Sequence, residues 1–391
     1  AKVRPWGVEE RDGKAGTFAD NTSFTLELPE TIHPDSARLT LDLSLATNET
    51  LLSLAEGGGW DVSLSATAAR AFALSTLALK MTGSALGSAR TERMRALARS
   101  AVGALLSAQN RDGSWPFVVA RDRRNISGDV STTAWALCAI LRAQEAGLIA
   151  DTTPSNNCIN WLQSNVSSHD SIPEQEALLA LSIAGAVDFS PLNRLNRNYK
   201  DLTPSGQAML GLAFAAMDKE SYAKTLADHL AAQGDKLDFH SRALAILLFD
   251  SVSGMGQSRR LFADSLLADL QRRWIYGAHR WLAITALASS SRSETPVYSG
   301  PEGDKANFEV DVLVNGKSVG TFSAPKDDNT SFSLSGIDLK LPAKVEFKYK
   351  GRGECAYRAQ LVGFSSKFER RRELDYSVHD EKFYHSPKLY K

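Results

Sequence analysis

A repeated pair of apolar residues constrains the fold of this chain most. A large apolar residue followed by a smaller one recurs at Phe72-Ala73, Leu137-Cys138, Leu179-Ala180, Leu210-Gly211, Leu244-Ala245 and Leu282-Ala283. The intervals between the pairs are 65, 42, 31, 34 and 38 residues. Apart from the first, each interval fits one helix-turn-helix unit, because it is too short for a domain and too long for a heptad. The repeat therefore predicts a closed ring of helical hairpins.

The periodicity between residues 48 and 291 is that of helices, with two kinds of helix in alternation. One face of each helix carries apolar residues at spacings of three and four. The more apolar helices are expected over 61–80, 130–146, 173–185, 204–217, 239–251 and 276–289. More polar helices are expected over 91–109, 155–166, 219–232 and 258–272. Polar helices outside and apolar helices inside are what a double-layered α/α barrel requires.

Strand patterns lie on both sides of the helical block. Phe24, Leu26 and Leu28 alternate with polar residues, and so do the leucines from 39 to 45. After the block, Asn315-Gly316 predicts a type I′ hairpin turn, with strands expected over 308–314, 319–322, 332–341, 345–349 and 356–364. We therefore predict that residues 17–46 and 306–366 form one β-sandwich, which the helical block interrupts.

Composition and charge exclude several classes of partner and site. The 391 residues hold 45 Lys and Arg against 45 Asp and Glu, without a basic stripe, which argues against a nucleic-acid or anionic-membrane partner. No apolar run reaches the roughly 20 residues that span a bilayer. Cys138, Cys158 and Cys355 lack C-x-x-C spacing, and the seven histidines lack metal-ligand spacing. We expect three buried thiols, no metal and no cofactor.

The most specific motif runs from Gln109 to Trp115 and continues from Asp129 to Trp135. Gly113 can turn the backbone after a helix, Gln109 can hydrogen-bond exposed backbone, and Trp115 can stack over the next hairpin. This motif resembles two families. One is the terpene cyclases with their Gln-and-Trp repeats, and the other is the thioester-containing domains of the alpha-2-macroglobulin and complement superfamily.

Terpene cyclases of the protonating class carry an Asp-x-Asp-Asp-Thr-Ala motif, in which several carboxylates hold one proton for an alkene. The corresponding run here is Asp129-Val130-Ser131-Thr132-Thr133-Ala134, which lacks two of those carboxylates. Since hydroxyl groups cannot protonate an alkene, Asp129 is better explained as a helix cap.

The resemblance to bacterial alpha-2-macroglobulins covers more of the chain. It implies a multidomain α and β fold, an (α/α)6 toroid inserted into a CUB-like β-sandwich. The implied parts are the first CUB-like strands over 1–47, a thioester-domain-like toroid over 48–291, a linker over 292–305, the remainder of the CUB-like domain over 306–368, and a lead into a following macroglobulin-like domain over 369–391.

The reactive centre of that family is a Cys-Gly-Glu-Gln or Cys-x-Glu-Gln run just before the first toroid helix, whose Cys and Gln form an internal thioester. The matching segment here is Glu56-Gly57-Gly58-Gly59-Trp60-Asp61-Val62, without cysteine or glutamine. A thioester needs a thiol, so no covalent capture is expected at this degenerate position, Gly58, Gly59, Trp60 and Asp61. We expect Trp60 to fill the space of the missing thioester loop.

Other candidate binding residues are Trp115, Asp129, Trp135, Tyr276 and His279. Tyr276 and His279 belong to a cluster from Arg272 to Trp281 that mixes cations with aromatic rings and could bind a ligand by cation-π contact. The alternative reading of this cluster is a helix C-terminus followed by the start of the next repeat.

The resemblance implies a non-enzymatic fragment of a bacterial alpha-2-macroglobulin-like protein, secreted or at the periplasm or cell envelope. It would trap peptidases or bind other proteins, beside the remaining domains of its parent chain. The alternative is an α/α toroid enzyme of terpene-cyclase-like or glycan-active type that uses the centre of the ring. Carboxylates facing the cavity would favour the enzyme, and an empty or tryptophan-filled cavity would favour the binding protein.

Overall fold

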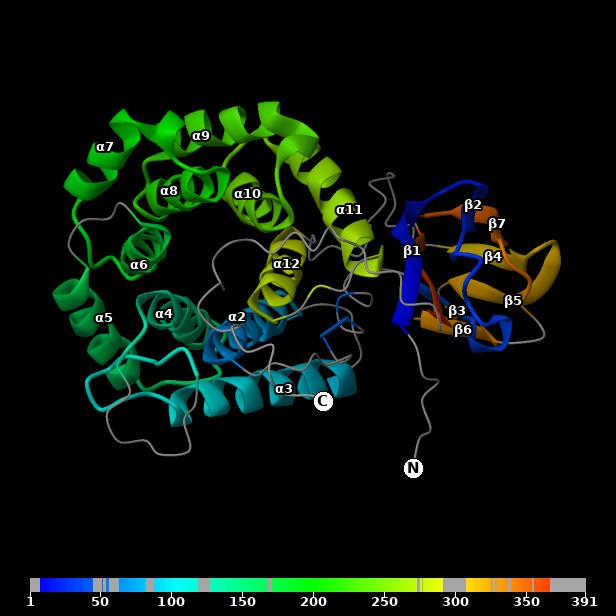
Figure 1. Ribbon diagram of the computed structural model, residues 1–391, viewed down its shortest axis with the longest axis horizontal. Helices are drawn as coiled ribbons and strands as arrows, with labels where there is room; N and C mark the ends of the chain where they lie inside the picture. The colour runs from blue at the N-terminus through cyan, green and yellow to red at the C-terminus, as the bar shows by residue number, and fades with distance from the viewer. Residues whose placement is uncertain are drawn as a thin grey trace, which may run out of the picture.

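The computed structural model contains helices and two antiparallel sheets (Figure 1). It describes residues 8–44, 51, 54–55, 63–81, 88–118, 127–166, 171–272, 275, 277–290, 307–324, 326–327, 329–335, 339–353 and 355–365. Among these residues, no helix combines the length and the apolar character that crossing a membrane requires.

The described helices form two layers around a common centre. The inner helices are α2 (Leu64–Met81), α4 (Val130–Glu145), α6 (Ile172–Ile183), α8 (Pro204–Ala216), α10 (Phe239–Ser251) and α12 (Gly277–Ser290). The outer helices are α3 (Ser88–Ser107), α5 (Thr153–Asn165), α7 (Phe189–Arg197), α9 (Glu220–Gln233) and α11 (Gly256–Arg272). Each inner helix packs against the next, and α12 packs against α2, so the inner layer closes into a ring (Figure 1).

Local sequence signals set the helix boundaries. At the N-termini, the side chains of Asp129, Thr203 and Asp238 accept hydrogen bonds from backbone N–H groups three residues later. At the C-termini of α4 and α6, Gly147 and Gly185 adopt positive φ of 64° and 66°, which ends each helix. The helix predictions therefore agree with the structure to within a few residues, except that α7 was missed.

The strands before and after the helical block share both sheets. One sheet has the order β1-β8-β3-β6 and the other β2-β7-β4-β5. The strands are β1 (Val8–Phe18), β2 (Thr22–Leu26), β3 (Arg38–Ser44), β4 (Asn307–Val314), β5 (Lys317–Ala324), β6 (Asn329–Ser335), β7 (Ala343–Arg352) and β8 (Cys355–Ser365). The predicted joint sheet system is confirmed by the pairing of β1 and β3 with β8 and of β2 with β7.

Two details of the sheets bear on the sequence predictions. Asn315 and Gly316 have positive φ of 50° and 78°, which confirms the predicted hairpin turn between β4 and β5. The first strand, however, begins at Val8 and not near residue 17. The start of this strand was not predicted, because the charged run from Glu9 to Asp12 lacks the apolar alternation that marks a half-buried strand.

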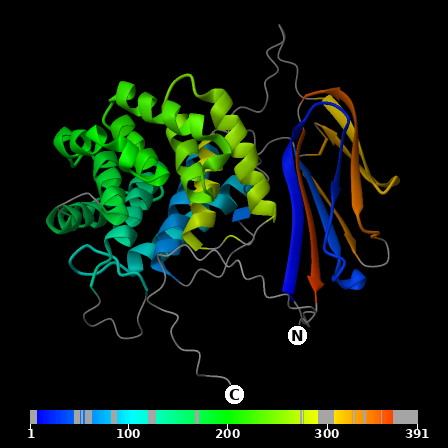
Figure 2. The ribbon, with the colours of Figure 1, turned by 45° about the horizontal axis from the view of Figure 1, so that its top comes forward.

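The helices and the sheets each have a hydrophobic core. In the β part, Phe18 stacks on Phe347 with ring centroids 4.8 Å apart, and Phe24 stacks on Tyr357 at 5.3 Å. The two parts touch where α11 packs against β1, and Ala15 of β1 packs against the helical core. Figure 2 shows β1 on the side of the sheets that faces the helices.

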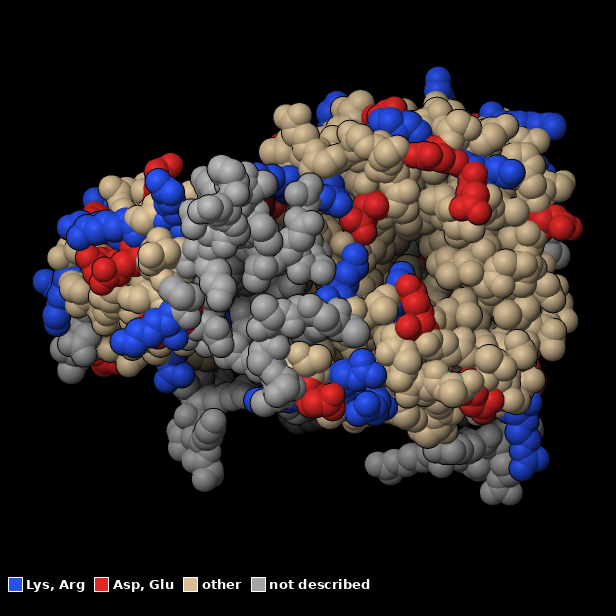
Figure 3. Space-filling model, turned by 180° about the vertical axis from the view of Figure 1, so that it is seen from behind, with Lys and Arg blue, Asp and Glu red and all other residues tan. Residues whose placement is uncertain are grey.

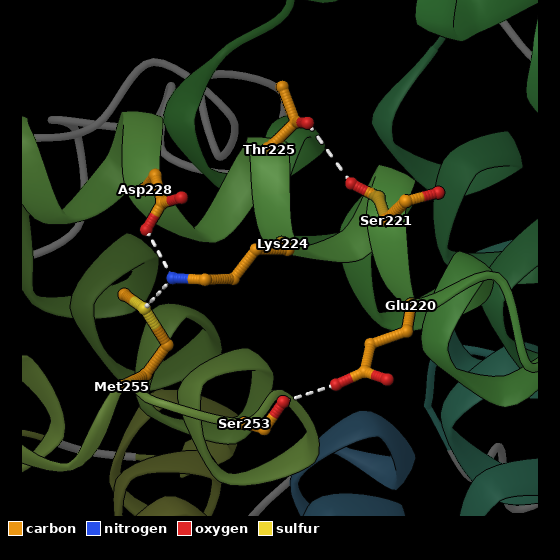
Figure 4. Close-up of polar contacts among 7 residues, drawn as sticks. All are labelled: Glu220, Ser221, Lys224, Thr225, Asp228, Ser253 and Met255. Atoms are coloured by element: carbon orange, nitrogen blue, oxygen red, sulfur yellow. Dashed lines mark hydrogen bonds and ion pairs between the residues drawn. The ribbon is translucent and has the colours of Figure 1, made fainter.

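Polar contacts tie the outer helix α9 to the loop between α10 and α11 (Figure 4). Lys224 Nζ donates to Asp228 Oδ1 at 2.6 Å and contacts Met255 Sδ at 3.1 Å. The Ser253 hydroxyl donates to the carboxylate of Glu220, and this bond lowers the pKa of that carboxyl. These contacts fix the position of one outer helix relative to the next hairpin.

Candidate functional site

Two of the predicted site residues, Asp129 and His279, lie at the N-terminal ends of the inner helices α4 and α12. The degenerate thioester position, Gly58, Gly59, Trp60 and Asp61, lies outside the described residues, and so does Tyr276. The first backbone N–H of α2, that of Leu64, donates to the carbonyl of Phe117 at 2.9 Å. The loop that carries Trp115 therefore adjoins the start of α2.

Trp115 is fully buried and holds this loop in place. Its indole Nε1 donates to the Leu105 carbonyl of α3 at 2.8 Å, and its backbone N–H donates to Thr133 Oγ1 of α4 at 2.9 Å. The backbone N–H of Asp129 donates to the Trp115 carbonyl at 2.8 Å. Trp115 thus joins α3 to the start of α4 through its indole and its backbone, and its buried ring leaves no surface for a ligand in this conformation.

Gln109 and Gly113 shape the same loop. Gln109 Nε2 donates to the carbonyls of Gly113 and Pro154, each at 3.0 Å, so it joins the loop to the start of α5 as its predicted role required. Gly113 has φ of 94°, and a Cβ there would lie 2.4 Å from the Asn157 carbonyl oxygen. The motif is therefore a structural connection between two hairpins.

Asp129 is the N-cap of α4, and Trp135 lies within that helix. The Asp129 carboxylate accepts the Thr132 N–H at 2.8 Å, which confirms its predicted role as a helix cap. Trp135 is 8% exposed, its ring lies 6.1 Å from that of Phe72, and its Nε1 donates to Glu176 Oε1 at 2.9 Å.

Glu176 is a polar residue of the ring's interior that the sequence analysis did not single out. It lies in the first turns of α6 and is 7% exposed. Burial raises the pKa of its carboxyl, hydrogen bonds from Ser131 and Trp135 oppose that shift, and the Asp129 charge adds to it. Glu176 falls in the helix expected over 173–185, just before the apolar residues Ala177 and Leu178.

His279 is exposed and lies beside His240, which is half-buried. The rings of His240 and His279 are 4.8 Å apart. Burial, and secondly the nearby His279, lower the pKa of His240 to about 4, whereas the Asp238 charge acts in the opposite direction. Next to them Arg70 lies over the Trp281 ring at 5.5 Å, and Arg280 Nη2 donates to the Leu54 carbonyl at 2.8 Å. Trp281 is fully buried, so this cation-π contact is internal to the ring.

All three cysteines are free and buried. Burial raises the pKa of Cys138 in α4 and of Cys355 in β8 to about 12, and it also raises the pKa of Cys158 in α5. At neutral pH these thiols are protonated, and a protonated thiol is a poor nucleophile. The expected buried thiols are confirmed. Among the described residues, no group of three or more metal-ligating side chains lies close enough to hold a metal ion.

A cavity of about 290 Å³ lies toward the other end of the ring, at the C-terminal ends of the inner helices. It is lined by Phe72, Trp135, Cys138, Arg142, Leu179, Ile183, Leu212, Ala215, Ala216, Leu247, Asp250, Ser251 and Ser289. Seen from behind, the helical part is hollowed near its middle, with acidic and basic side chains around the hollow (Figure 3). Asp250 is the carboxylate of this lining, and it pairs with Arg259 at 2.6 Å.

Comparisons with known proteins identify the fold. No family model and no curated protein sequence matches the chain. Among solved structures, native Escherichia coli alpha-2-macroglobulin from domain MG7 to the C-terminus is similar over 94% of this chain and 59% of its own, with a TM-score of 0.61 and 15% identity.

Two structures of longer alpha-2-macroglobulin chains agree. The native Escherichia coli protein matches with a TM-score of 0.62 and 15% identity over 94% of this chain. The Salmonella protein reacted with methylamine matches with a TM-score of 0.61 and 17% identity over 93% of this chain. This chain spans 24% of each of those two chains. The resemblance drawn from the sequence is therefore confirmed at the level of the fold.

Proposed function

Since this chain has the fold of the C-terminal region of bacterial alpha-2-macroglobulins, we propose that it is the thioester-domain-like part of such a protein and that it acts without a thioester. In this proposal the helices form an α/α toroid inserted into a CUB-like β-sandwich, divided at the residue boundaries given above. The parent protein would be secreted or would reside in the periplasm or cell envelope. It would trap peptidases or bind other proteins sterically.

One observation carries the proposal. The segment 56–62 that leads into α2 contains no cysteine, and the three cysteines of the chain are buried in α4, α5 and β8. Methylamine was reacted with the Salmonella relative. Without a thiol at the start of α2, this chain has no acyl group there for methylamine or a peptidase lysine to attack.

Intact-mass measurement tests the absence of a thioester. After methylamine treatment we expect no mass change, whereas the Salmonella protein under the same conditions serves as the positive control. After incubation with a peptidase, denaturing electrophoresis should show no covalent adduct. A mass shift that peptide mapping assigns to residues 56–62 would refute the proposal.

Steric trapping is tested separately, on the longest natural protein that contains this chain. A trapped peptidase should retain activity on a small peptide substrate and lose activity on a large protein substrate. Equal activity on both substrates, with no complex on size-exclusion chromatography, would contradict trapping and leave protein binding of another kind.

Trp60 is proposed to fill the space that a thioester loop would occupy. Burial of its ring would contribute on the order of 2 to 3 kcal/mol, and Trp60→Ala would destabilise the helical part by about 3 to 5 kcal/mol. Thermal unfolding measures this. An unchanged melting temperature would mean instead that Trp60 is available to a partner.

The cavity lining supports this proposal over a toroid enzyme. Acid catalysis by the terpene-cyclase route needs several carboxylates around one proton. The described lining holds Trp135 and Phe72 and one carboxylate, Asp250, which is already ion-paired with Arg259. Cyclisation of a polyprenyl substrate that is lost in Asp129→Asn would overturn this preference.

A further inference from the structure

The cavity at the C-terminal end of the ring has an apolar floor and a polar mouth. Phe72 and Trp135 meet at a ring distance of 6.1 Å, and Leu179, Leu212 and Leu247 continue the apolar wall. Its volume of about 290 Å³ is close to the lower end of the range for small-molecule sites, roughly 300 Å³. The space therefore suits an apolar body of about one aromatic ring with a short chain.

Helix ends surround the mouth. The lining includes Arg142, Ile183, Ala216, Ser251 and Ser289, which stand within the last four residues of α4, α6, α8, α10 and α12. Each helix C-terminus carries a partial negative charge of about half an elementary charge. Five such ends around one opening favour a positive charge in the ligand.

The charged side chains at the mouth do not cancel this preference. Arg142 pairs with Glu145 at 2.7 Å, and Arg259 pairs with Asp250 at 2.6 Å, so the two pairs together are neutral. Arg142 also lies over the Phe72 ring, 5.9 Å from its centroid. Arg142 therefore already occupies this face of Phe72, and Asp250 is the group of the lining that can attract a ligand cation.

We propose that this cavity is a binding site for small amphipathic cations, namely an aromatic or branched aliphatic body that carries a primary ammonium group. The apolar body would pack on Trp135 and Phe72, and the ammonium group would lie at the mouth near Asp250. This site is independent of the proposed trapping function and of the segment 56–62.

Isothermal titration calorimetry with three matched probes tests the charge preference. Phenethylammonium should bind with millimolar or tighter affinity. The neutral 2-phenylethanol should bind about 3- to 10-fold more weakly, since it lacks the interaction with the helix ends. The anion 3-phenylpropionate should bind at least about 10-fold more weakly than phenethylammonium. An anion that binds best would overturn the proposal.

Two variants that fill the cavity test whether phenethylammonium binds there. Leu212→Trp fills the cavity and should abolish binding of phenethylammonium, and Ala216→Trp at the exposed end of α8 does the same with less risk to folding. The matched control is Leu261→Trp on α11, a residue that is 61% exposed, and it should bind as the parent does. Unchanged binding in folded Leu212→Trp or Ala216→Trp would show that the cation binds elsewhere and refute the proposal.

Two further variants change the charge at the mouth in opposite directions. Asp250→Asn should weaken binding of phenethylammonium by about 3- to 10-fold, because it removes the carboxylate near the ammonium group. Arg259→Gln leaves that carboxylate without its guanidinium partner and should strengthen binding by about the same factor. If both variants changed the affinity in the same direction, the assignment of Asp250 to the ammonium group would be wrong.

Discussion

Trp115 stabilises the helical part through packing and two hydrogen bonds. Its indole is fully buried and donates to the Leu105 carbonyl, and its backbone N–H donates to the Thr133 hydroxyl. We expect Trp115→Ala to lower the free energy of unfolding by about 3 to 5 kcal/mol through the cavity it leaves. Trp115→Phe should cost about 1 to 3 kcal/mol, since it leaves the Leu105 carbonyl without a donor. Urea denaturation measures both.

The control for this prediction is in the same loop. Phe117 is 45% exposed, so Phe117→Ala should change the free energy of unfolding by less than about 0.5 kcal/mol. Equal losses in Trp115→Ala and Phe117→Ala would mean that burial of the indole does not decide the stability of the loop.

Glu176 makes the stability of the ring depend on pH. The folded state raises the pKa of this carboxyl above its ordinary value of 4.5, so the folded state holds the proton more tightly than the unfolded chain. The stability from this proton is fully present below pH 4.5 and is lost as the pH rises through the folded pKa. Each unit of the shift corresponds to about 1.4 kcal/mol.

Glu176→Gln tests this dependence, because glutamine keeps an acceptor for the Trp135 indole and carries no charge. The difference in unfolding free energy between Glu176→Gln and the parent should shift in favour of the variant between pH 4 and pH 8. Chemical denaturation at several pH values measures it. A difference that stays constant over that range would show that Glu176 ionises in the folded state as it does in the unfolded one.

Sequence reasoning found some of these residues and missed others for physical reasons. Gln109, Trp115 and Asp129 were identified, because each makes at least one hydrogen bond to a residue nearby in the chain, namely Gly113, Leu105 and Thr132 respectively. Glu176 was missed, because its partner Trp135 lies 41 positions away on another helix. Phe72 and Trp135 line one cavity only after the ring has closed, so the cavity could not be read from the chain.

At the scale of the elements, two glycines with positive φ separate the cost of backbone strain from the cost of a steric clash. Gly113 has φ of 94° and would clash with the Asn157 carbonyl if it carried a Cβ, whereas Gly147 has φ of 64° and open space around it. We expect Gly147→Ala to cost about 1 to 2 kcal/mol, from backbone strain alone. Gly113→Ala should cost at least about 1 kcal/mol more, because α5 must move.

Thermal or urea unfolding of the two alanine variants measures that difference. The contact with Asn157 would be unimportant if the two variants lost the same stability. In Gly113→Ala, loss of the hydrogen bond from Gln109 to Pro154 should also make amide exchange faster at the start of α5. Gly147→Ala should leave that exchange unchanged.

Elements were predicted where their apolar period was regular. The six inner helices have small and large apolar residues around most of their surface, and their caps are local, so their positions were found. Helix α7 has nine residues, of which Leu192 and Leu195 are buried, so its apolar stripe is too short to stand out. Strand β1 begins with a run of charged residues without apolar alternation, and it is defined by its partner β8, which no local pattern reveals.

For the whole molecule, two separate cores predict two unfolding transitions. Trp281 is fully buried in the helical core, and Phe347 is 1% exposed in the β core. Each truncation to alanine should cost about 3 to 5 kcal/mol in its own core. Calorimetry should show Trp281→Ala lowering the midpoint of one transition and Phe347→Ala lowering the other. If each variant shifted both transitions equally, the contact between α11 and β1 would couple the two parts into one folding unit.

The pairing of β1 with β8 has a consequence for biosynthesis. Val8 pairs with Ser365, so the two partners are 357 positions apart in the chain. A ribosome that adds about 5 to 20 residues per second needs roughly 20 to 70 seconds to make that length. During this interval β1, β2 and β3 have left the exit tunnel without the strands that cover them, whereas the neighbouring helical hairpins can already pack on each other. The order of translation thus leaves β1, β2 and β3 with unpaired edges and exposed apolar residues until β6, β7 and β8 have been made, and a chaperone that shields this strand segment should raise the yield of native protein more than one that acts on the helices.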